Sequence, residues 1–293
     1  MVSTSSFTVE QCHLYAQRLN NSAAMCIEIG QYERAIFSLS KALRLSREQS
    51  DKSTVSGWIC CDCSLDGCIA YTESSVPVTI RNRNRIQSKD NVKCVFDLVY
   101  ERPIRIPPVS KMGPTLCLIV TFNLALAHHL SAITSGPSTT ARVYNSSNNE
   151  DARATRRNLQ TSGNKIRKAL QLYEMSQRVY NLITSPQIIS CIRFRLILSN
   201  NLSHIHRLAS NHTKHRQCLE HLLSTVMIAV EYKTRNHNSS NDTTTGTTNN
   251  SDNTNTEETT SSGNNAALCT TNLEGFLMNA SRLFLDSHCA EAA

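Results

Sequence analysis

Three stretches of this chain open helices with the same internal spacing, and this concealed repeat constrains the fold more than any other feature. The stretches begin at Leu19, Thr121 and Ser199. Each carries an asparagine, a small residue two positions later, and a cysteine or histidine five positions after the asparagine. These sets are Asn21, Ala23 and Cys26; Asn123, Ala125 and His128; and Asn201, Ser203 and His206. Repeated helical units hide their apolar faces by stacking on one another, so the spacing predicts an all-α array.

Apolar residues recur at steps of three and four along seven stretches, as on one face of an amphipathic helix. The stripes are Cys12, Tyr15, Leu19, Ala23 and Cys26; Ala35, Ile36, Leu39, Ala42 and Leu43; Ile119, Phe122, Leu126 and Leu130; Ala169, Leu170, Tyr173, Ser176 and Tyr180; Leu198, Leu202, Ile205 and Ala209; Leu219, Leu222, Leu223 and Val226; and Phe276, Ala280, Leu283 and Phe284. Gly30 separates the first two stripes and predicts a left-handed turn that ends the first helix. The two stripes then form an antiparallel hairpin.

We expect one helical domain over residues 8–288, interrupted by three insertions. Residues 49–113 read as an irregular insertion that ends in VKCVFDLVYERPIRIPP, whose β-branched and aromatic residues favour a strand or one small β-ribbon. Residues 136–163 are polar and predict a flexible insertion. Residues 234–265 consist almost entirely of Asn, Thr, Ser, Asp and Gly, which predicts a disordered low-complexity loop because they offer too little apolar surface to bury.

The segment NNSAAMCIEIGQYERAIFSLSKAL resembles a tetratricopeptide repeat, in which two short helices pack closely. It carries the small residue Ala23, the turn residue Gly30, the packing residue Tyr32, and Ala35 and Ala42 at the helix contacts. The axes of packed helices are about 8–10 Å apart, and the distance is shortest where the side chains at the contact are small. The three asparagines lie much further apart than the family's period of about 34 residues, so insertions would separate the units. The resemblance implies a short α-solenoid of irregular hairpins with a C-terminal capping helix.

The chain is also similar to divergent, uncharacterised repeat proteins of diatoms, including the C-terminal helix that contains GFLMN. That similarity brings no established activity. The tetratricopeptide resemblance implies a concave groove that binds protein or peptide, lined by the first helix of each unit. Some relatives clamp a carboxylate with Lys and Arg, but the corresponding positions here hold Asn20, Ala24 and Ile197. We therefore do not expect recognition of a C-terminal carboxylate.

In several tetratricopeptide proteins an asparagine at this helix position holds the backbone of an extended peptide. The resemblance places Asn21, Asn123 and Asn201 in that role, Asn279 as an extension of the row, and His128 and His206 in the same groove. An amide suits the task because it donates and accepts hydrogen bonds at once. The alternative is that each asparagine bonds only to a neighbouring helix, since buried polar groups usually find partners within the fold.

No pattern in the sequence predicts a metal, a cofactor or catalysis. Cys60, Cys61, Cys63 and Cys68, with Cys94, lack the paired Cys-x2-Cys spacing typical of zinc sites, so we interpret them as reduced thiols. The cluster of His204, His206, His212, His215 and His221 lacks a carboxylate or cysteine spaced to complete a site. The chain contains no phosphate-binding glycine loop, nucleophile elbow or HExxH motif, which favours a non-catalytic scaffold.

The net charge of +7 leaves one alternative function open. A basic set could bind RNA or an acidic partner, although no aromatic residues are interleaved for base stacking. It comprises Arg153, Arg156, Arg157, Lys165, Arg167 and Lys168. The first residues lack the apolar core of a secretory signal, and no apolar run reaches the roughly 18 residues of a membrane span. We therefore expect a location in the cytoplasm, with the nucleus as the alternative, and no membrane association.

Overall fold

A computed structural model describes residues 9–50, 65–75, 99–108, 112–135, 149–183, 192–239 and 270–281. Within these ranges the chain forms eight helices and no strand, which confirms the predicted all-α class. The helices are α1 (Val9–Glu28), α2 (Tyr32–Ser50), α3 (Leu65–Ser75), α4 (Gly113–Thr134), α5 (Asn149–Ile183), α6 (Ile192–Leu208), α7 (His212–Ser239) and α8 (Thr270–Ala280). The predicted β-ribbon is absent from the described part of its segment, because residues 99–108 run as an extended chain without strand pairing.

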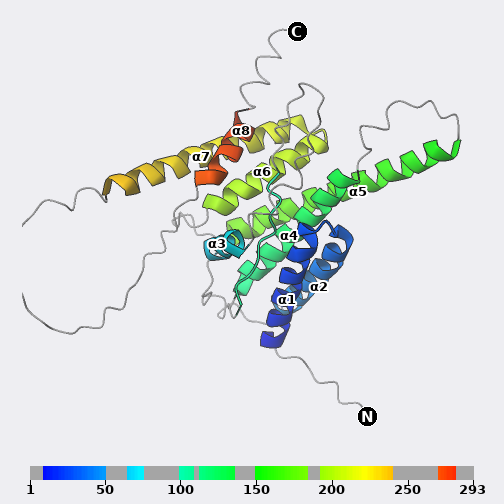
Figure 1. The fold of residues 1–293 in the computed structure, drawn as a ribbon, viewed down its shortest axis with the longest axis horizontal. Coiled ribbons are helices and arrows are strands. Elements are labelled where there is room, and N and C mark those ends of the chain that lie inside the picture. Colours follow the sequence, from blue (N-terminus) through cyan, green and yellow to red (C-terminus); the bar gives the residue numbers. More distant parts are fainter. Residues whose placement is uncertain are drawn as a thin grey trace, which may run out of the picture.

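The helices pack in pairs that follow the chain (Figure 1). The most extensive contacts join α1 to α2, α4 to α5 and α6 to α7. The second helix of each pair also packs on the first helix of the next, α2 on α4 and α5 on α6, and α8 packs on α7. The three stretches that share one spacing thus lie within the first helices of three successive hairpins, seven to ten residues after each helix begins rather than at its start.

Two of the hairpins turn in the same way. After α1, Gly30 adopts φ +79°, its N–H donates to the carbonyl of Ile27, and the N–H of Gln31 donates to the carbonyl of Cys26. After α6, in the third hairpin, Ser210 adopts φ 56° and the two equivalent bonds form. This pattern is the Schellman motif, which satisfies the last carbonyls of a helix. The predicted left-handed turn at Gly30 is confirmed.

These equivalent turns give a matched pair of substitutions. Gly30→Ala places a side chain in the left-handed conformation and should lower the free energy of unfolding by about 1 kcal/mol. No atom would crowd the new Cβ, so the cost comes from the backbone alone. Ser210→Gly relieves the same strain and should raise the unfolding free energy by up to about 1 kcal/mol. Chemical denaturation measures both changes. If the two variants changed the unfolding free energy in the same direction, the shared turn geometry would be contradicted.

The structure departs from each of the three predicted insertions. Helix α3 lies inside the insertion expected over residues 49–113, and α7 continues to Ser239, into the expected low-complexity loop. Helix α5 begins at Asn149, so residues 149–163 are helical rather than flexible. Eight of these fifteen residues are Ala, Arg, Glu, Gln or Leu, which are strong helix formers. Elongating an existing helix also avoids the cost of nucleating a new one.

Helix α4 is the centre of the core. Its residues from Leu116 to Ala127 are buried with one exception. The helix packs on α1, α2 and α5, and its Phe122 ring contacts Phe194 on α6. Among the described helices it alone is long and apolar enough to cross a membrane, by length and composition. Most of that stretch is buried inside the fold, as in the core helix of a folded domain.

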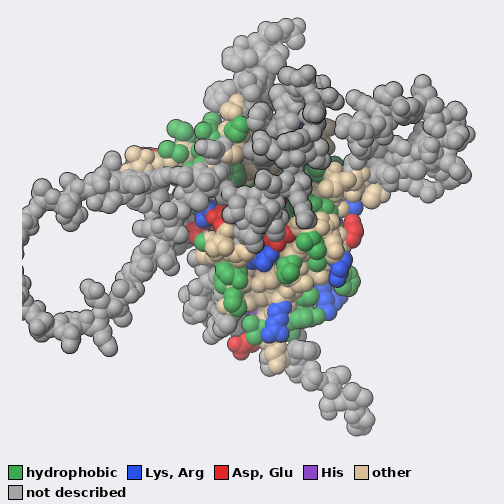
Figure 2. Space-filling view, in the orientation of Figure 1, with side chains coloured by type: hydrophobic (Ala, Val, Ile, Leu, Met, Phe, Trp, Pro, Cys, Tyr) green, Lys and Arg blue, Asp and Glu red, His purple; other side chains and the backbone are tan. Residues whose placement is uncertain are grey.

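The far end of the helix stack presents apolar side chains to solvent. In Figure 2, hydrophobic atoms gather over the region where α7 and α8 meet. Large exposed residues on these helices are Met227, Ile228, Val230, Leu277 and Met278. A repeat stack has an uncovered face at its last unit, so this exposure fits the position of α7 and α8.

Candidate functional site

An extended segment, residues 99–108, lies across the first helices of all three hairpins (Figure 1). Asn21 on α1, Asn123 on α4 and Asn201 on α6 each bind the backbone N–H and C=O of one residue in this segment. The amide oxygen accepts from the N–H and the amide nitrogen donates to the C=O. The bond lengths are 2.9 and 3.1 Å from Asn201 to Tyr100, 2.8 and 2.8 Å from Asn123 to Ile104, and 2.9 and 2.8 Å from Asn21 to Ile106. We call these three asparagines the asparagine ladder.

Further asparagines support the ladder from neighbouring helices. Asn20 donates to the Ile104 carbonyl at 3.1 Å, and its own oxygen accepts from Asn123 at 2.9 Å. Asn279, predicted to extend the row, donates to the Asn200 side chain at 2.6 Å. The contact between Asn279 on α8 and Asn200 on α6 is therefore equivalent to the contact between Asn123 on α4 and Asn20 on α1. The equivalence supports the alignment of the C-terminal helix with the earlier openings.

Helix α3 holds the other edge of the segment. The backbone N–H of Arg105 points away from the ladder and donates to the Thr72 hydroxyl at 2.7 Å. Successive N–H groups of an extended chain alternate in direction, so Ile104 and Ile106 face the ladder while Arg105 faces α3. Glu73 on α3 pairs with Arg193 on α6, which ties this helix to the third hairpin.

The side chains of the segment are held as firmly as its backbone. Ile104 and Ile106 are fully buried in the core. The guanidinium of Arg105 pairs with the carboxylate of Glu28 at 2.5 Å. Burial raises the pKa of Tyr100, chiefly by removing its phenol from water. Pro103 has no N–H to satisfy and restricts its neighbour to extended conformations, so the sequence favours this shape.

A chain of buried polar groups runs from the ladder into the core. Asn201 donates to the Tyr173 hydroxyl at 3.2 Å, and that hydroxyl lies 3.3 Å from Nδ1 of His129. Nε2 of His129 lies 2.8 Å from Nδ1 of His204. Burial first, and the charge of His204 second, hold the pKa of His129 well below its usual value. The Nε2 atom of His204 lies 3.5 Å from the Arg207 guanidinium, and the donor and acceptor roles along this chain follow from the tautomers of the two imidazoles.

His128 and His206 face other helices than the ladder does. Each follows its asparagine by five residues, which turns it about 140° around the helix axis. Near His128 lie Glu33 on α2 and Lys168 on α5; burial, followed by the Lys168 charge, lowers the pKa of His128 to about 4. Burial also lowers the pKa of His206, which is near Glu174. Nδ1 of each ring has no hydrogen-bond partner among the described residues, so neither holds the segment by that atom.

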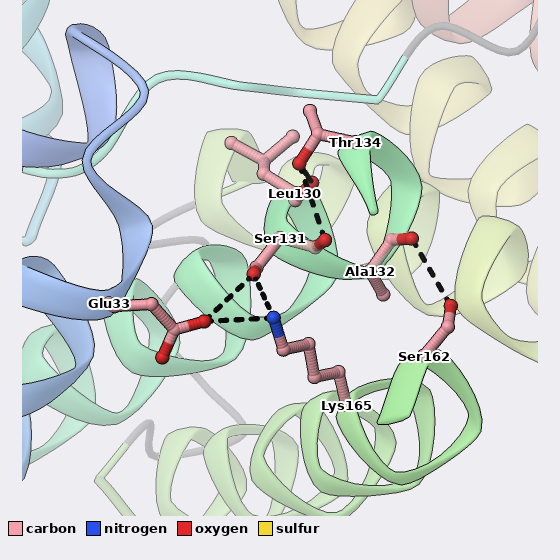
Figure 3. A network of polar contacts seen from close by, with 7 residues as sticks. All are labelled: Glu33, Leu130, Ser131, Ala132, Thr134, Ser162 and Lys165. Atoms are coloured by element: carbon pink, nitrogen blue, oxygen red, sulfur yellow. Dashed lines mark hydrogen bonds and ion pairs between the residues drawn. The ribbon is translucent and has the colours of Figure 1, made fainter. Parts of the chain in front are cut away.

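A polar contact joins the first two hairpins away from the ladder (Figure 3). Nζ of Lys165 donates to Glu33 at 2.8 Å and to the Ser131 hydroxyl at 2.7 Å. The hydrogen bond from Lys165 is the main cause that lowers the pKa of Glu33. Lys165 belongs to the basic set predicted for an acidic partner, so one member of that set is already paired within the fold.

The other candidate clusters fall partly outside the structure. Cys60, Cys61, Cys63 and Cys94 lie outside the described residues, whereas Cys68 is buried on α3. In the described ranges, no three His, Cys, Asp or Glu side chains are arranged to hold a metal ion. Nδ1 of His215 lies 2.9 Å from the hydroxyl of Ser203 and 2.9 Å from the backbone carbonyl of the same residue. That histidine joins α6 to α7.

Comparisons with protein-family models, curated proteins and solved structures return no match. The geometry of the site therefore carries the functional argument.

Sequence reasoning named the three asparagines and missed what they bind. The segment was predicted as strand or ribbon, and its period-two pair Ile104 and Ile106 between prolines was the available signal. A strand-like segment bounded by prolines cannot pair regularly with another β-strand, because each proline removes a backbone N–H that the pairing needs. Such a segment can instead be bound by side chains that hydrogen-bond the backbone of single residues, as the asparagines do.

Proposed function

We propose that this protein is a non-catalytic, tetratricopeptide-like α-solenoid scaffold that binds an extended peptide across the first helices of its hairpins. One observation carries the proposal: each asparagine of the ladder binds both backbone groups of a single residue in an extended chain. The residue bound belongs to the protein's own segment 99–108. A peptide from a partner would take the place of that segment.

The asparagine ladder suits peptide recognition because its hydrogen bonds to the segment go to the backbone. Backbone N–H and C=O groups occur in every peptide, and an amide satisfies both without bringing in a charge that must lose its water. A net contribution of about 1 kcal/mol for each hydrogen bond would hold a chain in register. Extended peptides are commonly bound by such main-chain contacts, with side-chain contacts adding specificity.

The test uses the synthetic peptide Val99–Pro108 and a full-length chain whose own segment is weakened. Ile104→Asp with Ile106→Asp places two carboxylates in the core and should release the segment. The added peptide should then raise the thermal midpoint of the variant in proportion to the logarithm of its concentration. The parent protein should respond far less, because its segment competes as part of the same chain.

Circular dichroism first shows whether the double variant is helical. If it is not, Ile106→Ala serves as the recipient, because it weakens the same contact by a smaller amount. A scrambled peptide is the control for non-specific binding. A helical recipient whose midpoint does not change with the Val99–Pro108 peptide would overturn the proposal.

Binding of RNA or an acidic partner through the basic set is the second candidate. Arg167 and Lys168 are exposed on α5, whereas Lys165 is paired with Glu33. Phosphate contacts release counterions, so RNA binding by this face would weaken steeply with salt. Retention of RNA binding by Arg167→Ala with Lys168→Ala would exclude this face.

A further inference from the structure

Resting on the proposed function, we infer that the site selects one class of peptide: an extended segment with a cationic residue between two branched aliphatic residues. In the bound segment these are Arg105 between Ile104 and Ile106. The ladder cannot distinguish sequences, because it contacts backbone alone. Selection comes from the groups that meet the side chains, and Glu28 is the residue that selects the cation.

The Glu28 carboxylate lies at a place where it needs a cationic partner. It is only 14% exposed, and the Arg105 side chain is 21% exposed. Oε2 of Glu28 binds the guanidinium at 2.5 Å, while Oε1 has no hydrogen-bond partner among the described residues. A neutral side chain in place of arginine would leave a largely buried carboxylate unpaired, and an acidic one would repel it. Both should bind much more weakly.

The flanking positions require apolar side chains. Ile104 and Ile106 are both fully buried within the same hydrophobic cluster as α1 and α4 residues. Their alternation with Arg105 follows from the period of two in an extended chain. A polar or charged residue at either place would lose its water without gaining a partner in an apolar surrounding. The peptide class therefore combines two buried aliphatic residues with one paired cation.

Fluorescence anisotropy with labelled peptides tests this selection. The recipient is the full-length Arg105→Glu chain, whose own segment is weakened at the position under study and whose buried isoleucines remain. The Val99–Pro108 peptide should bind this recipient at least about tenfold more tightly than the same peptide with Arg105→Glu. A peptide with Arg102→Glu is the matched control, because it changes the net charge equally two residues before the isoleucine. It should retain most of its affinity.

The reverse substitution identifies Glu28 as the selecting residue. In a recipient that carries Glu28→Lys and keeps Arg105, the two cations repel and weaken the segment, and the preference for the arginine peptide should vanish or invert. Equal binding of the arginine and glutamate peptides to the first recipient would overturn the selection and leave the proposed function standing. If no peptide binds either recipient, and both are helical by circular dichroism, the proposed function fails and the selection fails with it.

Discussion

Replacing Asn123 with alanine should lower the free energy of unfolding by about 3 kcal/mol and the thermal midpoint by about 8 °C. Asn123 is fully buried, and its amide makes three hydrogen bonds. Without it, the N–H of Ile104 and the side-chain oxygen of Asn20 lose these partners in the core. An unpaired buried polar group costs about 1–3 kcal/mol, and two such groups account for the expected loss.

Asn21→Ala is the matched control for this prediction. Asn21 makes the same pair of bonds to Ile106, but it is only partly buried, so water can replace the amide. Its loss should cost about 1 kcal/mol. Amide hydrogen exchange separates the ladder from general packing, because Asn123→Ala should speed exchange at Ile104 more than at Ile106. Equal destabilisation by the two variants would contradict the burial assigned to the middle position.

The positions of the ladder asparagines could be read from the sequence because the repeat itself is encoded in spacing. Asn21 and Asn201 each stand nine residues before the left-handed residue of the turn, Gly30 and Ser210. Nine residues after Asn123 the chain is still helical, because α4 continues to Thr134. The second unit therefore lacks the turn that marks the other two. The aligned asparagines therefore show the repeat more clearly than the turns do.

Side-chain burial on α1 shows where apolar periodicity misleads. The stripe through Tyr15 predicted one buried face, yet Tyr15 is 41% exposed. The buried face lies one residue further on and contains Ala16 and the polar residue Asn20. Asparagine counts as a surface residue in any hydrophobic pattern, so a helix that buries asparagines toward a bound segment shifts the apparent stripe.

The occupant of the ladder could not be predicted because its contacts are distant in sequence. Asn21 and Ile106 are separated by 85 positions, and Asn201 and Tyr100 by 101. Local propensity describes the segment as extended, which is correct, but does not say what satisfies its backbone. Every buried N–H needs a partner, and three asparagines at equivalent repeat positions, with no partner assigned, were the complementary signal.

Acid should destabilise this protein well before its carboxylates protonate. Burial holds the pKa of His129 far below its usual value, and the pKa of His128 falls to about 4. The unfolded chain therefore binds more protons than the folded one once the pH falls below about 6.5. Stability is present above that pH and declines as the pH falls toward the folded-state pKa values. Each histidine that stays neutral costs up to about 1.4 kcal/mol per pH unit, and less for the partly exposed His128.

Thermal unfolding between pH 7.5 and pH 5 measures this decline, and we expect the midpoint to fall by several degrees. His129→Gln cannot take up a proton and should flatten the decline, although it lowers stability at pH 7.5 by disturbing Tyr173 and His204. His212→Gln, at an exposed position at the start of α7, is the control. Protonation of His129 places a buried charge beside the Tyr173 hydroxyl, which accepts a hydrogen bond from Asn201, so acid should also speed exchange of the Tyr100 amide. A midpoint that stays constant down to pH 5 would show that these histidines are not buried as described.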